Sequence, residues 1–116
     1  MSFVSYNVEG TVSKESILKE IIKLTDCSYL AMQETYLSVS SALCHKYTHD
    51  NYELVSRSED MFIKDRMMRL SYQNKAGVGA LVNRDVMKVC QEIESQSDRI
   101  LIHKLSLGKK TLLVVT

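Results

Sequence analysis

Two polar residues stand where strands are expected to end, and their side chains suit the chemistry of phosphate groups. Glu34 follows the apolar run Ser28 to Gln33, and Asn7 closes the short run that begins at Phe3. Ligand sites of open α/β sheets gather at the carboxyl ends of parallel strands. A carboxylate there can anchor Mg²⁺, which needs one or two protein carboxylates, and a carboxamide can donate to a phosphate oxygen. Asn7 and Glu34 are therefore the candidate catalytic pair, with Glu34 as the metal ligand.

Both residues also have a purely structural explanation. Glu34 fits a solvated carboxylate at the end of a strand, and Asn7 fits a turn residue that acts with Gly10. Arg99 follows Asp98 at the start of an expected strand, where it can contact phosphate. An Asp-Arg pair at such a place is more often an exposed ion pair that contributes little. These alternatives stay open on the sequence alone.

Two other groups of side chains are weaker candidates. His45 and His49 are four residues apart beside Cys44, a spacing that can bind a transition metal on a helix. No second pair with ligand spacing completes a tetrahedral set, so a surface pair without metal is the simpler interpretation. A charged segment can track a nucleic-acid backbone, although a solvated loop is the more ordinary interpretation. Its relevant residues are Lys64, Arg66, Arg69, Tyr72 and Lys75.

The first third of the chain predicts a parallel β-α-β unit. Phe3 to Val8 is rich in β-branched and aromatic residues and ends before a glycine, as strands do. Ser13 stands where a helix N-cap is wanted. Apolar residues then recur at helical spacing: Ile17, Leu18, Ile21, Ile22 and Leu24. The run 28–33 follows closely, and a right-handed crossover would bring Asn7 near Glu34.

The remaining elements are mostly strands. A weaker helical pattern covers Val39 to Tyr47, a short strand is expected at Asn51 to Val55, and Ser56 to Lys75 is expected to be a charged loop. From residue 77 the apolar period becomes two. It predicts strands at Gly77–Val82, Val86–Ile93, Arg99–Leu107 and Thr111–Val115, the last two joined by a hairpin turn. The predicted fold class is α/β, with a mixed β-sheet and a flanking helix.

Composition restricts the class of protein. At 116 residues with 45% hydrophobic side chains, the chain is at most one small domain, and its net charge of +1 gives no field that steers it to nucleic acid or to a membrane. Its apolar runs are far shorter than the ~20 residues that cross a bilayer. Three cysteines without tight spacing and the absence of a leader pattern predict an intracellular protein with reduced thiols, in the nucleus or the cytoplasm.

Three segments carry a recognisable pattern when they are taken together and in order. They are Ser5–Gly10, Ala31–Thr35, and a third that runs from Gly77-Val78-Gly79 through Ser97–Ile100 to Leu112–Val115. They resemble the N-terminal half of the exonuclease-endonuclease-phosphatase superfamily, which includes apurinic/apyrimidinic endonucleases, pancreatic-type deoxyribonuclease and the endonuclease domains of LINE-type retrotransposons. The pair Tyr36-Leu37 after Gln33-Glu34-Thr35 is more similar to the retrotransposon branch.

The resemblance implies Mg²⁺-dependent hydrolysis of phosphodiesters, with DNA as the partner of the full domain. It also implies one half of a four-layer α/β/β/α sandwich, Glu34 as the metal ligand and Asn7 in the catalytic pocket. The family supplies a nucleophile-orienting Asp, the Asn two residues after it and a closing Asp-His pair from its second half, and no matching motif occurs here. His103 lies inside a strand-like run, and the chain ends at Thr116, about where the family continues into Tyr-Ala-Pro. A fragment or degenerate copy that is inactive alone, with weak or no Mg²⁺ binding, is expected.

Two other interpretations belong to different classes. One is a non-enzymatic module that associates through an exposed sheet face, and the other is an enzyme assembled from two chains. The strands are expected to form one sheet with one face open, lined by Val78 to Val82 and Leu112 to Val115. Contiguous apolar surface of this kind favours partner binding. A homodimer, or binding to the missing C-terminal half, is therefore expected.

Overall fold

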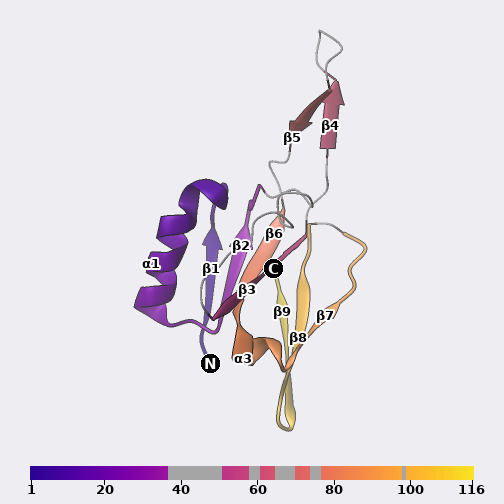
Figure 1. Ribbon diagram of the computed structural model, residues 1–116. Coiled ribbons are helices and arrows are strands. Elements are labelled where there is room, and N and C mark those ends of the chain that lie inside the picture. The colour runs from indigo at the N-terminus through magenta and orange to yellow at the C-terminus, as the bar shows by residue number, and fades with distance from the viewer. Residues whose placement is uncertain (37–50, 58–60, 65–69, 74–76, 98) are drawn as a thin grey trace.

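A computed structural model describes residues 1–36, 51–57, 61–64, 70–73, 77–97 and 99–116 (Figure 1). Its elements follow in this order: β1 (Phe3–Asn7), η1 (Val12–Lys14), α1 (Glu15–Thr25), β2 (Tyr29–Gln33), β3 (Tyr52–Arg57), β4 (Met61–Lys64), β5 (Leu70–Gln73), β6 (Val78–Asn83), α3 (Arg84–Met87), β7 (Cys90–Ile93), β8 (Ile102–Leu107) and β9 (Lys110–Val115). The predicted α/β class is confirmed.

The strands form two main sheets and a small hairpin. The first sheet has the order β1-β2-β6-β3, the second has the order β7-β8-β9, and β4 pairs with β5. In the first sheet β1 and β2 are parallel, whereas β6 runs antiparallel to both β2 and β3. The sheet is therefore mixed, and the predicted parallel β-α-β unit is confirmed.

The first sheet is covered on both faces. Leu18 and Ile22 of α1 pack with Leu30 and Leu81 on one face, and burying each such side chain contributes roughly 1.5–3 kcal/mol. On the other face the second sheet and α3 complete a separate core (Figure 1). That core comprises Tyr29, Val78, Ala80, Val82, Val86, Leu101 and Leu105. The layers are helix, sheet and sheet, as in part of an α/β/β/α sandwich.

The structure corrects three expectations in the second half of the chain. The strands do not form one sheet. Val78 to Val82 do not line an open face either, because both faces of the sheet that contains β6 are covered. The stretch 56–75 contains β4 and β5, in line with the β-forming residues Phe62, Ile63 and Tyr72. The strand expected from Val86 begins only at Cys90, because Asn83 accepts a hydrogen bond from Asp85 N and starts α3.

The start of α1 also differs from the expectation. Ser13 is not its N-cap, because it lies inside η1 and donates to the carbonyl of Gly10 at 3.1 Å. Glu15 and Lys19 form an ion pair at 3.2 Å, one turn apart on α1. The helix expected over 39–47 lies outside the described residues.

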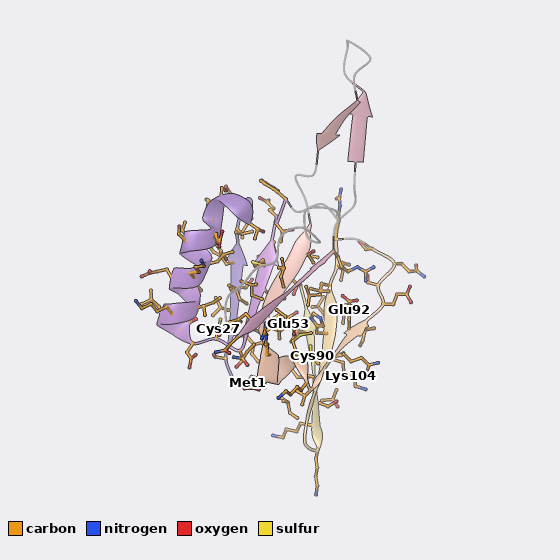
Figure 2. All side chains as sticks on the ribbon, in the orientation of Figure 1. Met1, Cys27, Glu53, Cys90, Glu92 and Lys104 are labelled. Atoms are coloured by element: carbon orange, nitrogen blue, oxygen red, sulfur yellow. The ribbon has the colours of Figure 1, made fainter. Side chains whose placement is uncertain are left out.

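Two observations concern compartment and membrane. Cys27, beside α1, and Cys90, on the second sheet, are free thiols on different layers (Figure 2). No helix in the described part of the chain is long and apolar enough to cross a membrane.

Candidate functional site

The site begins with the two parallel strands whose carboxyl ends lie side by side. Asn7 is the last residue of β1 and lies opposite Gln33, which directly precedes Glu34. Three backbone hydrogen bonds continue the ladder beyond the strands. Val8 N donates to Gln33 O at 3.0 Å, Gly10 N to Glu34 O at 2.9 Å and Thr11 N to Thr35 O at 2.9 Å. The two loops, residues 8–11 and 34–36, are thus joined along their length, and we call them the paired loops.

The paired loops hold an unusual backbone. Within the described residues, four non-glycine residues have a positive φ, and three of them lie here: Glu9 (47°), Glu34 (53°) and Tyr36 (54°). Such conformations cost of order 1–3 kcal/mol each and gather at functional sites. Gly10, at φ 102°, is needed for a second reason, because a Cβ there would lie 3.2 Å from the ring of Tyr36. The backbone hydrogen bonds between the two loops offset the energetic cost of these conformations.

Glu34 is half-buried and has a neighbour that restrains it. The Tyr36 hydroxyl donates to Glu34 Oε2 at 3.4 Å. The pKa of Tyr36 is raised by desolvation and then by the negative charges of Glu34 and, more weakly, Glu9. The negative charges of Glu34 and Glu9 thus both raise the pKa of the same Tyr36 hydroxyl. Glu9 is a candidate that the sequence did not single out, since an exposed Glu after a strand looks ordinary until its neighbours are known.

Asn7 is exposed at the same end of the first sheet. Val4 and Tyr6 pack toward α1, so the alternation of a strand places Ser5 and Asn7 on the opposite face. There Gln33 Nε2 donates to Ser5 Oγ at 3.2 Å. The structure thus places Asn7 and Glu34 at the ends of neighbouring parallel strands, as the sequence predicted.

A cavity of about 290 Å³ opens beside the paired loops. Its lining comprises Gly10, Thr11, Ser13, Thr35 and Tyr36. Thr35 is fully buried, and its hydroxyl has no hydrogen-bond partner among the described residues. A buried unsatisfied hydroxyl costs about 1–3 kcal/mol, so this cavity wall retains unused hydrogen-bonding capacity next to Glu34.

The donor set suits a hard cation better than a transition metal. In the described ranges, no group of three or more His, Cys, Asp and Glu residues gathers as a metal site. The paired loops offer two carboxylates, Glu9 and Glu34, and Asn7 ends β1 two residues before Glu9 and opposite Gln33. Mg²⁺ prefers oxygen ligands and needs one or two carboxylates, and oxygen donors are the kind that these loops carry.

Other predicted candidates lie elsewhere. Arg99 is exposed before β8, and its backbone N–H donates to Ser97 Oγ at 3.2 Å. No hydrogen bond or ion pair in the described part of the chain joins it to Glu34 or Asn7. Cys44, His45, His49, Arg66, Arg69 and Lys75 lie outside the described residues, and the side chains of Lys64 and Tyr72 are not among those described.

His103 has a partner that the sequence did not reveal. It is buried between the sheets, where its Nδ1 lies 2.5 Å from the hydroxyl of Tyr29 and the two rings meet edge to face. Burial raises the pKa of Tyr29 to about 12 and lowers that of His103. Seventy-four residues separate the pair in sequence, so only the stacking of the two sheets reveals it. It is an element of the core, away from the paired loops.

The arrangement of sheets, helix and paired loops is that of an α/β endonuclease fold. The crystal structure of the AP endonuclease LMAP from Leishmania major matches 97% of this chain with a TM-score of 0.67 at 16% sequence identity. The chain spans 38% of the length of that endonuclease. At this identity the match shows the fold, and it confirms at that level the resemblance found in the three sequence segments. Comparisons with models of protein families and with curated proteins give no match.

Proposed function

We propose that this chain carries the first part of a Mg²⁺-dependent phosphodiesterase site of endonuclease type, and that it does not cleave nucleic acid alone. The observation that carries the proposal is the pair of strained loops at the carboxyl ends of β1 and β2, with Asn7 and Glu34 at their start. The fold similarity to an AP endonuclease supports the same reaction class. The residues 33–37 further favour an origin in a retroelement. A nucleic-acid substrate agrees with an intracellular location, in the nucleus or the cytoplasm.

Each residue has a definable part in such a site. Glu34 and Glu9 would hold the cation, and Tyr36 fixes the Glu34 carboxylate through its hydroxyl. A bound Mg²⁺ supplies charge neutralisation at a phosphate and stabilises a leaving oxygen. The Asn7 amide donates to a phosphate oxygen and orients it. The positive φ angles of Glu9, Glu34 and Tyr36 are backbone strain of the kind that gathers at functional sites.

The resemblance implies a base that positions water for in-line attack, and no histidine in the described part of the chain stands at the paired loops. Proton transfer requires a group within about 2.6–3.2 Å of the attacking water. His103, the one histidine in the described part of the chain, is bonded to Tyr29 between the sheets. Positioning contributes several kcal/mol of a catalysed barrier, so metal and amide alone give little rate.

Mg²⁺ titration by calorimetry of the full chain tests the metal site. We expect weak binding that falls about tenfold or more in Glu34→Gln, because one of two carboxylates is lost. Glu20→Gln is the matched control, since Glu20 is the same residue type but lies exposed on α1. Equal binding by wild type and Glu34→Gln would exclude the proposed ligand.

A plasmid-nicking assay in Mg²⁺ tests the second half of the proposal. Wild type should nick no faster than Glu34→Ala, because the proposed site holds only part of the group of catalytic residues that the resemblance implies. Mg²⁺-dependent nicking clearly above that variant would overturn the claim of inactivity while leaving the metal site standing. A contrary result in one assay therefore leaves the claim that the other assay tests standing.

The exposed apolar residues of β9 favour a second function, that of an interaction module. It does not depend on the metal site.

A further inference from the structure

Tyr36 is an exposed aromatic residue whose ring is restrained at two points. The residue is 39% exposed and lies in the paired loops. One edge of its ring lies against Gly10, since a Cβ added to Gly10 would be 3.2 Å from Tyr36 Cδ2. At the far end of the ring, the hydroxyl donates to Glu34 Oε2 at 3.4 Å. An aromatic ring that solvent can reach is therefore already oriented beside the proposed cation site.

Gly10 keeps the cavity beside this ring open. An added Cβ would lie 3.2 Å from both Ser13 Oγ and Tyr36 Cδ2, and Ser13 and Tyr36 both line the cavity. Any other residue at position 10 would therefore fill the cavity or move its walls. At about 290 Å³ the cavity is just under the roughly 300–1,000 Å³ of small-molecule sites. Its size suits a single ring system.

The polar atoms at the opening of the cavity are hydrogen-bond acceptors. Ser13 and Tyr36 are the two exposed residues among those that line it. Ser13 donates its hydroxyl hydrogen to the carbonyl of Gly10 at 3.1 Å, and Tyr36 donates its own to Glu34. Both hydroxyl oxygens keep lone pairs that can accept from a ligand. A ligand that brings N–H donors is therefore complementary to this opening.

The charges around the cavity disfavour a phosphate group inside it. The described residues that line it are all uncharged, so none of them neutralises an anion. The carboxylates of Glu9 and Glu34 belong to the same paired loops and would repel an anion there. An aromatic wall with acceptor oxygens instead suits a nucleobase, because bases stack on aromatic side chains and their amino groups donate hydrogen bonds.

We propose that this cavity binds a nucleobase that carries an amino group, with one face of the base on the ring of Tyr36 and the amino group toward Ser13 Oγ. The base belongs to a nucleotide next to the phosphate at Glu34, and this placement rests on the function proposed above. Stacking accepts every base, so the contact with the amino group supplies a preference for adenine, cytosine and guanine over thymine and uracil.

Titration of the full chain with adenosine, followed by NMR, tests the base site without Mg²⁺ and without phosphate. We expect chemical-shift changes at the Tyr36 ring and at the amides of Gly10 and Thr11, because a stacked purine adds its ring current there. Tyr36→Leu should weaken binding at least about fivefold, since it removes the aromatic face, whereas Tyr36→Phe should retain binding. Phe3→Leu is the matched control, because Phe3 is 42% exposed at the opposite end of β1.

Purine riboside, which is adenosine without the amino group, tests the second contact. It should bind wild type about three- to tenfold more weakly than adenosine does, as expected for the loss of one hydrogen bond. In Ser13→Ala the two nucleosides should bind alike, because the acceptor is gone. Equal binding of both nucleosides by wild type would exclude the contact between the amino group and Ser13.

Two results would refute the base site itself. One is the absence of any shift at Tyr36 up to millimolar adenosine, and the other is adenosine binding that Tyr36→Leu leaves unchanged. Neither result depends on the cation, because adenosine carries no phosphate. If adenosine binds at Tyr36 while Glu34→Gln leaves Mg²⁺ binding unchanged, the base site stands and the proposed metal ligand is wrong.

Discussion

β6 and β9 are similar in composition and opposite in environment. Val78-Gly79-Ala80-Leu81-Val82 and Thr111-Leu112-Leu113-Val114-Val115 are both short runs of aliphatic and small residues. Every one of the first five is buried, whereas four of the second five are exposed. A continuous apolar run normally indicates a strand covered on both faces. β9 departs from that rule, because only Val114 of this run packs against a core in the described structure.

The difference comes from position in the layers. β6 lies between β2 and β3, with Leu81 against the core under α1 and with Ala80 and Val82 against the core under the second sheet. β9 is the last strand of the second sheet and has a covered side only at Val114. The same residue type therefore contributes to the core in one strand and is exposed in the other.

The largest effect that tests this comparison is the loss of one leucine from each strand. Leu81→Ala should cost about 2–5 kcal/mol of unfolding free energy, because Leu81 is fully buried and a cavity remains. Leu113→Ala should stay within about 0.5 kcal/mol, as surface substitutions do. Urea unfolding at a concentration below self-association measures both. Similar losses from the two variants would mean that β9 is buried in solution.

A smaller effect concerns the close packing of β6 against β3. A Cβ at Gly79 would lie 2.9 Å from the carbonyl oxygen of Val55, so Gly79→Ala should cost about 1–3 kcal/mol by overpacking. Gly108→Ala in the β8-β9 turn is the contrast, because φ there is 63° and no atom lies within 4 Å of the added Cβ. Its cost, about 1–2 kcal/mol, arises from backbone conformation alone. Amide chemical shifts of β3 should move only in Gly79→Ala, and unmoved shifts in both variants would contradict the tight contact.

Local pattern was enough to predict most elements but not their layers. The helical spacing of Leu18 and Ile22 and the short connection to β2 determine the β-α-β unit, because both signals are local. Residues 84–87 form a helix despite their strand-like composition, because the Asn83 side chain caps the helix N-terminus. Whether a strand is covered on one face or two depends on the stacking of the sheets, which involves residues far apart in sequence. For that reason the sequence predicts an open face for β6, and this prediction is wrong.

The candidate site divides in the same way. Asn7 and Glu34 could be placed at strand ends because parallel pairing follows from the short crossover. Glu9 and Tyr36 could not, because their roles depend on positive φ angles that the ladder between the paired loops imposes. Glu and Tyr are not residues that favour this conformation, so the sequence gives no signal for it.

The smallest expected effect is a change in the pH dependence of stability at the contact that joins the two sheets. Burial lowers the pKa of His103 below its ordinary value of 6.5, and the negative charge of Glu92 only partly opposes this. Tyr29 faces His103 from β2, and Glu92 lies opposite His103 on β7, where Figure 2 labels it together with Cys90. Below pH 6.5 the unfolded chain binds a proton at His103 more readily than the folded chain does. Stability from this group is therefore complete above pH 6.5 and declines as the pH falls toward the lowered pKa.

Urea midpoints between pH about 7.5 and about 5.5 should decrease with acidity in wild type and decrease less in His103→Gln, which cannot titrate. The remaining histidines, His45 and His49, are present in both chains and cancel in the difference. If the two chains lose stability in parallel over this range, protonation of His103 does not weaken the joint between the sheets.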